Sequence, residues 1–180
     1  MRPDPATLTM TNELRFLCDE MLVGLGPWLR IAGYDTAIAE RGRRDRDLVE
    51  QARDEGRILL TRDRRLVEIR RANDRTVVLE ENDIDSCAKE LCRRLSLDWT
   101  LDPLTRCTLC NTRLALANRR LLYTLPPRIR ALGWTVHVCP QCGRLFWEGS
   151  HVRRMLKRLE CFAHASPRRE AQVGELKTTA

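Results

Sequence analysis

Short apolar runs alternate with amphipathic segments along the first hundred residues of the chain. Four of these runs have the length of buried strands, and they cover residues 14–18 (LRFLC), 36–39, 58–61 (ILLT) and 76–79 (TVVL). Between them the pattern predicts helices over 21–32, 45–55 and 64–72, the first of them kinked at Pro27 or starting there. Strands alternating with helices predict an α/β fold with a parallel sheet that helices cover on both faces.

A further helix follows the last predicted strand and has one continuous apolar face. Its apolar side chains recur at helical spacing, at Ile84, Cys87, Ala88, Leu91, Cys92 and Leu95. We interpret Cys87 and Cys92 as core residues, because an unpaired cysteine packs as a small hydrophobic side chain. Cys18, within the first strand, is interpreted in the same way.

The periodicity ends near residues 101–103, where we place a domain boundary. The predicted organisation has four parts: residues 1–13 disordered, 14–102 an α/β domain, 103–160 a small cysteine-bearing domain with a basic helix, and 161–180 a disordered tail. The apolar runs are too short to span a membrane, and the N-terminal residues lack the features of a secretion signal. We therefore expect a soluble, cytoplasmic protein.

Charge is distributed unevenly between the two predicted domains. Residues 12–102 hold 17 Lys and Arg against 20 Asp and Glu, a net charge of −3. Residues 103–180 hold 14 against 4, a net charge of +10. Such asymmetry indicates a nucleic-acid partner for the basic part, although a merely solubilising basic surface has the same composition.

Four cysteines in the basic part have the spacing of a metal site. Cys107 and Cys110 form one CxxC pair, and Cys139 and Cys142 form a second pair after 28 intervening residues. Paired CxxC turns match tetrahedral Zn²⁺, and four thiolates fill its coordination sphere, so the sequence predicts one structural zinc ion per chain. A pair of disulfides and a redox CxxC are the competing interpretations.

A predicted basic helix follows the second CxxC pair, in the stretch EGSHVRRMLKRLE. Its cationic side chains form two rows at i, i+4 spacing and are candidates for RNA contact: Arg153, Arg154, Lys157 and Arg158. The neighbouring Phe146 and Trp147 could stack on RNA bases, but packing within the small domain is the favoured interpretation.

Acidic residues recur where the predicted strands end. Asp19 follows the first strand and Asp63 the third, while the remaining candidates are Asp45 and Asp47 after the second strand and Asp83 after the fourth. The carboxyl ends of parallel strands share one edge of the sheet, so we expect up to four carboxylates to converge there. Carboxylates so close would require a cation, and Mg²⁺ or Mn²⁺ with oxygen ligands suits phosphodiester hydrolysis. Each Asp could instead cap the helix that follows it.

Three stretches together resemble a known nuclease family: FLCDEMLVGLGPWLRIAGYDT (16–36), DRDLVEQARDEGRILLTRDRRL (45–66) and CTLCN … CPQCGRLFWEGSH (107–151). The chain is similar, over residues 14–159, to the PIN-like RNases named after the C-terminal domain of the Mut-seven exonuclease. The resemblance implies a PIN-like domain, a zinc ribbon, and a metal-dependent RNase whose acids match Asp19, Asp63 and one of Asp45 and Asp47. Asp83 has no clear counterpart in the family.

The resemblance also implies contacts between arginines and RNA. Arg30 matches a family position in the WLR element, and Arg62 and Arg64 flank Asp63, where they would balance the acidic edge or meet phosphates. We therefore expect a Mg²⁺- or Mn²⁺-dependent ribonuclease acting on RNA, with transfer and ribosomal RNA as candidate partners. The alternatives are a non-catalytic RNA- or ribosome-binding module and a protein-interaction adaptor.

Overall fold

The computed structural model describes residues 14–68 and 75–164. The predicted disorder of residues 1–13, and of the part of the predicted tail from 165 to 180, lies outside the described residues, as does the end of the helix predicted over 64–72. No helix in the described part of the chain combines the length and apolar character needed to cross a membrane.

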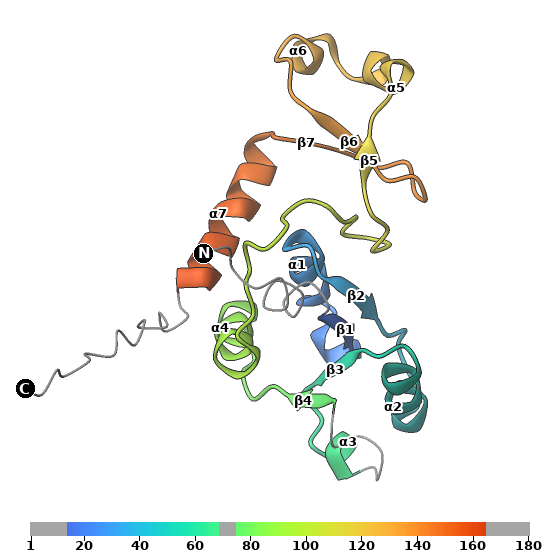
Figure 1. The fold of residues 1–180 in the computed structure, drawn as a ribbon, viewed down its shortest axis with the longest axis vertical. Helices are drawn as coiled ribbons and strands as arrows, with labels where there is room; N and C mark the ends of the chain where they lie inside the picture. The colour runs from blue at the N-terminus through green and yellow to red at the C-terminus, as the bar shows by residue number, and fades with distance from the viewer. Residues whose placement is uncertain (1–13, 69–74, 165–180) are drawn as a thin grey trace, which may run out of the picture.

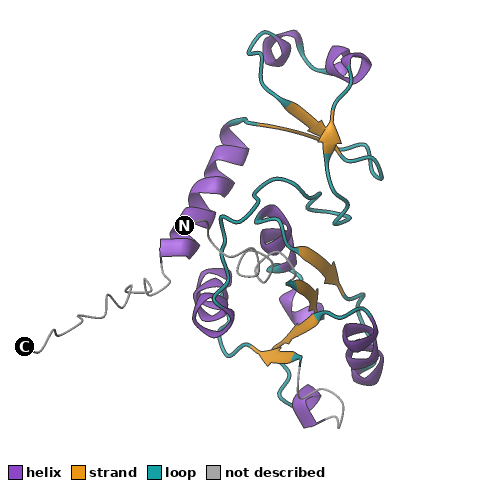
Figure 2. Ribbon diagram, viewed as in Figure 1, coloured by secondary structure: helices purple, strands orange, loops and turns teal. Residues whose placement is uncertain are grey.

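The first domain contains the predicted parallel sheet. Its four strands are β1 (Arg15–Cys18), β2 (Asp35–Ile38), β3 (Ile58–Thr61) and β4 (Thr76–Val78). The strands are all parallel and lie in the order β2-β1-β3-β4, with helices on both faces (Figures 1 and 2). The predicted α/β fold is therefore confirmed, and each apolar run lies within one residue of its strand.

The helices of this domain are η2 (Glu20–Leu22), α1 (Gly26–Ile31), α2 (Asp45–Asp54), α3 (Arg65–Glu68) and α4 (Ile84–Leu95). The helix predicted over 21–32 is thus divided, and α1 begins beside Pro27, whose missing N–H is not needed in a first turn. Asp45 does not cap α2, because Arg44 occupies the position before the helix.

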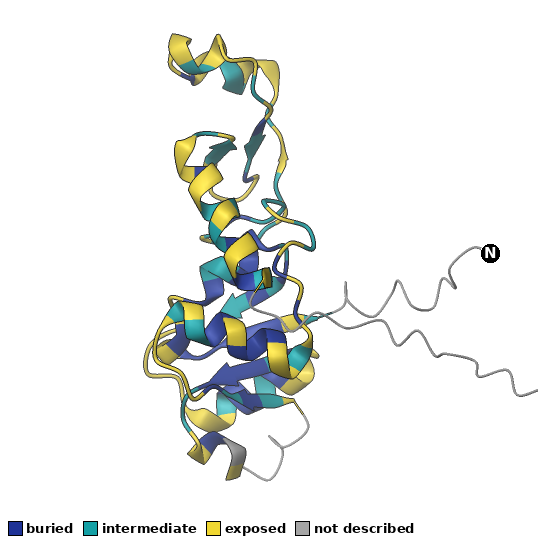
Figure 3. Cartoon of the chain, turned by 90° about the vertical axis from the view of Figure 1, so that its left-hand side faces the viewer, coloured by how far each residue is buried: buried dark blue, intermediate teal, exposed yellow. Residues whose placement is uncertain are grey.

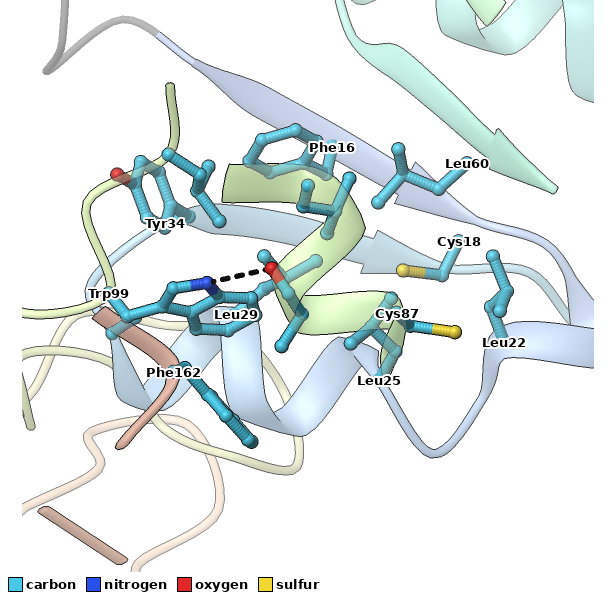
Figure 4. Close-up of a cluster of buried hydrophobic side chains, with 14 of the residues drawn as sticks. Phe16, Cys18, Leu22, Leu25, Leu29, Tyr34, Leu60, Cys87, Trp99 and Phe162 are labelled. Carbon is cyan, nitrogen blue, oxygen red and sulfur yellow. Dashed lines mark hydrogen bonds between the residues drawn. The ribbon is translucent and has the colours of Figure 1, made fainter. Parts of the chain in front are cut away.

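The alternating strand residues divide the core between the two sheet faces. Leu17 and Leu59 pack on one face against α2, whereas Phe16, Cys18 and Leu60 pack on the other face against α1 and α4 (Figure 4). Burial on both faces explains why these strands are continuous apolar runs rather than alternating ones.

The predicted core cysteines are buried as expected, with Cys18, Cys87 and Cys92 each exposing 2 % or less of their surface. Burial, together with neighbouring Asp19, raises the pKa of Cys18 to about 12. These thiols are therefore protonated at neutral pH and act as packing groups.

The second domain is a three-stranded antiparallel ribbon with helical additions. Its strands are β5 (Ala115–Leu116), β6 (Val136–Val138) and β7 (Leu145–Trp147), in that order in the sheet. Helices α5 (Arg119–Thr124) and α6 (Pro127–Arg130) lie between β5 and β6, at the end of the molecule far from the parallel sheet (Figure 1). Most of this end is exposed or half-buried (Figure 3).

The last helix, α7 (Ser150–His164), leaves the ribbon and packs on α4 of the first domain. Residues 161–164 continue this helix, so the predicted start of a disordered tail at 161 is wrong. Phe162 is buried in the main core, with its ring 5.7 Å from that of Trp28 and 5.0 Å from that of Trp99. The Trp99 indole in turn donates to the carbonyl of Ala88, 3.3 Å away (Figure 4).

Replacing Phe162 by Ala is expected to lower the free energy of unfolding by about 3–5 kcal/mol, because it leaves a cavity between two indole rings. Urea unfolding followed by tryptophan fluorescence would measure this loss. Cys161→Ala is the matched control, since Cys161 is exposed on the same helix turn. Equal stability of the two variants would contradict the packing of α7 on this core.

Candidate functional site

Asp19 lies directly after β1 and is held by the backbone that follows it. It is 3 % exposed. Its Oδ1 accepts hydrogen bonds from the N–H groups of Met21 at 2.8 Å and Leu22 at 3.1 Å, so the side chain caps η2. The carboxylate thus has a fixed orientation at the carboxyl end of the sheet.

A threonine hydroxyl connects Asp19 to the segment that carries Asp63. Thr61, the last residue of β3, donates its hydroxyl to Asp19 Oδ2 and accepts the N–H of Asp63 at 2.9 Å. Asp63 Oδ1 accepts the N–H of Arg65, the first residue of α3, at 2.9 Å. The ends of the neighbouring strands β1 and β3 therefore bring Asp19 and Asp63 into one hydrogen-bonded unit.

The other candidate acids do not join this unit. Asp45 is exposed in the first turn of α2, and Asp47 pairs with Arg44 at 2.9 Å. Asp83 is exposed and caps α4, where its Oδ1 accepts the N–H of Ser86 at 2.9 Å. Among the described residues, no three carboxylates bring their oxygens within 4.8 Å of one another. The expected convergence of up to four carboxylates is therefore not seen.

Arginines surround the end of β3 and have acidic or amide partners. Arg62 donates to Asn82, Arg64 lies 3.2 Å from Glu80, and Arg65 lies 3.4 Å from Asp63. The side chains of Arg64 and Arg65 are about four-fifths exposed, so these pairs contribute little stability and can exchange for other anions.

The four cysteines of the ribbon form a compact cluster. All four sulfurs lie within 4.8 Å of one another, with 3.7 Å between Cys107 and Cys142 and 3.3 Å between Cys110 and Cys139. Four sulfurs at about 2.3 Å from a central Zn²⁺ would be separated by similar distances. The predicted quartet is thus assembled in a geometry that fits a tetrahedral metal ion.

The two CxxC turns have the same backbone shape. The N–H of Asn111 bonds to the carbonyl of Cys107 at 3.0 Å, and the N–H of Gly143 bonds to that of Cys139 at 2.9 Å. Asn111 and Gly143 occupy equivalent positions and have φ angles of 66° and 70°. Glycine and asparagine are the residues that tolerate this left-handed conformation best.

The environment of the cluster favours the thiolate form of Cys139, in the second CxxC turn. Burial opposes ionisation of Cys139, but the N–H groups of Cys142 and Gln141 and the Cys110 thiol outweigh it and lower the pKa to about 6. Burial raises the pKa of Cys107 to about 12. Since metal ligation requires thiolates, binding of an ion would release protons, including that of the Cys107 thiol.

Arg30 makes structural contacts within the first domain and with the first CxxC turn. It is 6 % exposed, and its guanidinium donates to the carbonyl of Thr36 at 2.8 Å. It also donates to the carbonyls of Thr108 at 2.9 Å and Leu109 at 2.5 Å, inside the first CxxC turn. Nε and one terminal nitrogen of Arg30 are thus engaged by backbone oxygens, which gives the side chain a structural role, and its contact with phosphate stays a prediction.

Asn111 makes a second connection between the ribbon and the sheet. Its side chain accepts the N–H of Thr36 at 3.0 Å and donates to Asp35 at 2.7 Å, at the start of β2. Arg106 adds a donor to the Gly33 carbonyl at 3.1 Å. We name Arg30, Asp35, Arg106 and Asn111 the ribbon clamp. It lies at the amino end of β2, about 10 Å along the strand from the edge that carries Asp19.

The ribbon clamp makes stability depend on pH in acid. Burial alone would raise the pKa of Asp35, but hydrogen bonds from Arg57 and Asn111 outweigh it and lower the pKa from 3.8 to about 2. A carboxylate with a lowered pKa stabilises the fold fully above its unfolded value and loses this effect as the pH falls through the folded value.

Asp35→Asn is therefore expected to cost about 2 kcal/mol at neutral pH and to flatten the decline in stability between about pH 4 and pH 2. Urea unfolding at several pH values would measure both effects. Asp54→Asn is the control, because Asp54 is exposed and, among the described residues, forms an ion pair with its neighbour Arg53 alone. A wild-type pH dependence in Asp35→Asn would refute the assignment.

The basic residues of α7 divide into two kinds. Arg158 pairs with Asp85 at 2.6 Å and lies 4.6 Å from the Trp28 ring, so it joins α7 to the first turn of α4. Arg153 lies 6.0 Å from the ring of Trp134 in the ribbon. Arg154 and Lys157 are exposed on the helix surface. These last two are the α7 candidates best placed for RNA.

Comparison with known proteins adds one finding to this geometry. A family model described as the Mut7-C RNAse domain matches residues 14–159, which include the parallel sheet, the cysteine quartet and most of α7. Neither a curated protein nor a solved structure matches the chain. The matched residues cover most of the sequence, and the chain belongs to the Mut7-C RNAse domain family.

Proposed function

We propose that the chain is a Mg²⁺- or Mn²⁺-dependent ribonuclease whose centre is built on Asp19 and Asp63. The family supports a ribonuclease-related function. The observation that carries the assignment to these two acids is the Thr61 hydroxyl, which joins the Asp19 carboxylate to the backbone of Asp63. Buried polar links of this kind fix functional groups at strand ends, where α/β sheets bind their ligands.

Two carboxylates are sufficient for the proposed metal. Mg²⁺ commonly binds through one or two carboxylates and keeps several waters, so it does not need the four acids expected from the sequence. Asp45, Asp47 and Asp83 are secondary candidates at the same edge. When bound, such an ion would activate water and offset the negative charge of the phosphodiester.

The residues around the pair have distinct roles in this proposal. Asp19 is oriented by two N–H groups and a hydroxyl, whereas Asp63 has 27 % of its side chain exposed and can meet a ligand from solvent. Arg62 and Arg64 would exchange their present partners for RNA phosphates, because charge-assisted bonds to phosphate are stronger than exposed ion pairs.

The ribbon would position RNA and take no part in the chemistry. Four cysteines leave no open coordination position on a zinc ion, so the ion would be structural. The net charge of +10 over residues 103–180 supports RNA as the ligand, and Arg154 and Lys157 extend that charge along α7 towards the first domain. Transfer and ribosomal RNA are the candidate substrates.

One observation favours a second candidate, a non-catalytic RNA-binding protein. The candidate acids other than Asp19 and Asp63 are solvent-facing or engaged in a helix cap or an ion pair. An acidic edge of this kind could remain as structure alone. RNA binding without cleavage would identify this alternative.

Cleavage of a pool of cellular RNA tests the proposal. Purified protein with Mn²⁺ or Mg²⁺ is expected to shorten the RNA and to leave 5′-phosphate ends, whereas the same protein without added metal is expected to be inactive. Cleavage that proceeds equally without a divalent ion would contradict the metal-dependent mechanism.

A further inference from the structure

The insertion between β5 and β6, residues 117–135, is larger than the small ribbon sheet requires. Asn118 caps α5 by accepting the N–H of Leu121 at 3.0 Å, and Pro127 begins α6. Neither helix contains a buried side chain, and Leu125 between them is buried. The helices of the insertion therefore present their side chains to the surface and add almost nothing to a buried core.

This surface contains a cavity of about 640 Å³. Its apolar lining includes Leu122, Leu125, Ile129, Trp134 and Val136. A cavity of this size and lining falls in the range that holds small ligands or the ring of a larger ligand.

Cations and aromatic rings meet at the edge of the cavity. Tyr123 is 60 % exposed, and the guanidinium groups of Arg119 and Arg130 lie 6.0 Å and 5.4 Å from the centre of its ring. Arg153, from α7, lies 6.0 Å from the ring of Trp134. The exposed ring of Tyr123 and the half-buried ring of Trp134, with arginines over them, form a stacking surface that is positively charged.

The charge around the cavity has one sign. Residues 103–147 contain seven arginines and no lysine, aspartate or glutamate. In the described part of the chain, Arg119 and Arg130 form no ion pair with a carboxylate. An anionic ligand would therefore find these cations without displacing an acidic side chain.

A ligand that combines negative charge with flat rings fits this surface. Single-stranded RNA presents both, because its phosphates meet arginines and its unpaired bases stack on aromatic side chains. Double-stranded RNA fits less well, because its bases are stacked inside the duplex. An acidic peptide also fits less well, because its charged residues carry no aromatic ring.

We propose that the cavity is a binding site for an unpaired RNA base, with Tyr123 and Trp134 as stacking partners and with Arg119 and Arg130 on the flanking phosphates. The inference rests on the proposed function, since it identifies single-stranded RNA as the substrate class that the ribbon holds. Arg153 connects this site to the basic rows of α7.

Fluorescence anisotropy with a labelled single-stranded RNA oligonucleotide tests the site in the full chain. An Asp63→Asn background keeps the RNA intact. Tyr123→Ala is expected to raise Kd about tenfold, while Tyr123→Phe retains tight binding because it keeps the ring. Leu132→Ala is the matched control, since Leu132 is an exposed apolar residue of the same insertion that does not line the cavity.

A second pair of variants separates contact from net charge. Arg130→Gln and Arg128→Gln each remove one positive charge from α6, but only Arg130 lines the cavity. Arg130→Gln is expected to weaken binding more and to reduce the salt dependence by about one phosphate contact. Equal losses from the two variants would overturn the proposal.

Unchanged affinity in Tyr123→Ala, or equal affinity for a duplex, would also overturn it, as would competition by polyglutamate as strong as that by RNA. The outcomes remain distinct from those for the nuclease. If the wild type cleaves RNA but Tyr123→Ala does not change the RNA affinity measured in the Asp63→Asn background, this site alone is refuted. If binding depends on Tyr123 but the wild type does not cleave RNA, the nuclease alone is refuted.

Discussion

Cys139→Ser is expected to abolish zinc binding and unfold the ribbon, while the four-stranded sheet remains folded. The reason is the small number of buried side chains in residues 103–147, which are Cys107, Leu125, Val136 and Cys139. Two of these four are members of the quartet, so little apolar burial remains to stabilise the ribbon without metal. Structural zinc contributes about 10–16 kcal/mol in small zinc domains at neutral pH.

Elemental analysis and trypsin digestion would measure this effect. The wild type should carry about one zinc ion per chain. In Cys139→Ser the zinc should be lost, and the ribbon arginines should become accessible to trypsin. Cys161→Ser is the matched control, because Cys161 is exposed on α7 and lies outside the quartet. Zinc retained in full by Cys139→Ser would contradict the predicted site.

The two acids of the candidate centre should respond differently to amidation. Asp63→Asn is expected to reduce RNA cleavage by about 100-fold or more with little change in stability, because an amide oxygen can still accept the N–H of Arg65. Asp19→Asn should lose cleavage and also about 1–3 kcal/mol of stability, since one amide position would face the Thr61 hydroxyl that now donates to Asp19.

Rates of cleavage and urea unfolding of both variants would separate these effects. Asp54→Asn serves as the control, as an exposed aspartate on α2 that pairs with its neighbour. The account would be wrong if Asp63→Asn cleaved RNA at the rate of Asp54→Asn.

The sheet could be predicted from the sequence because its strands are buried on both faces. Each strand is therefore a continuous apolar run, and the intervening helices exclude an antiparallel arrangement. The cysteine quartet was equally evident, since paired CxxC turns are the spacing typical of tetrahedral metal sites. These features depend on local patterns.

The ribbon clamp could not be predicted, because it joins residues far apart in the sequence. Arg30 and Thr108 are 78 residues apart, and no periodic pattern connects them. The family resemblance alone suggests RNA as the partner of Arg30, whereas its Nε and one terminal nitrogen donate to backbone carbonyls. The sequence contained one signal for the role of Asn111. Asn111 follows the first CxxC pair and Gly143 follows the second, and asparagine and glycine at this position indicate a positive φ angle.

The packing of α7 on the first domain was missed for a different reason. The apolar stripe of Val152, Met155 and Leu159 continues at helical spacing to Phe162, but the predicted domain ended at residue 160. The convergence of the acids was overestimated, because a shared sheet edge does not fix where side chains in exposed helix turns point. Asp47 and Asp83 illustrate this point, as both are engaged by local partners.

The most direct test of the nuclease is a cleavage time course with one RNA pool, using wild type and Asp63→Asn, each with and without Mn²⁺. Zinc content and unfolding curves would establish that both proteins are folded. Cleavage is expected only from the wild type with metal. Equal cleavage by both proteins, or intact RNA with folded wild type in Mn²⁺, would contradict it.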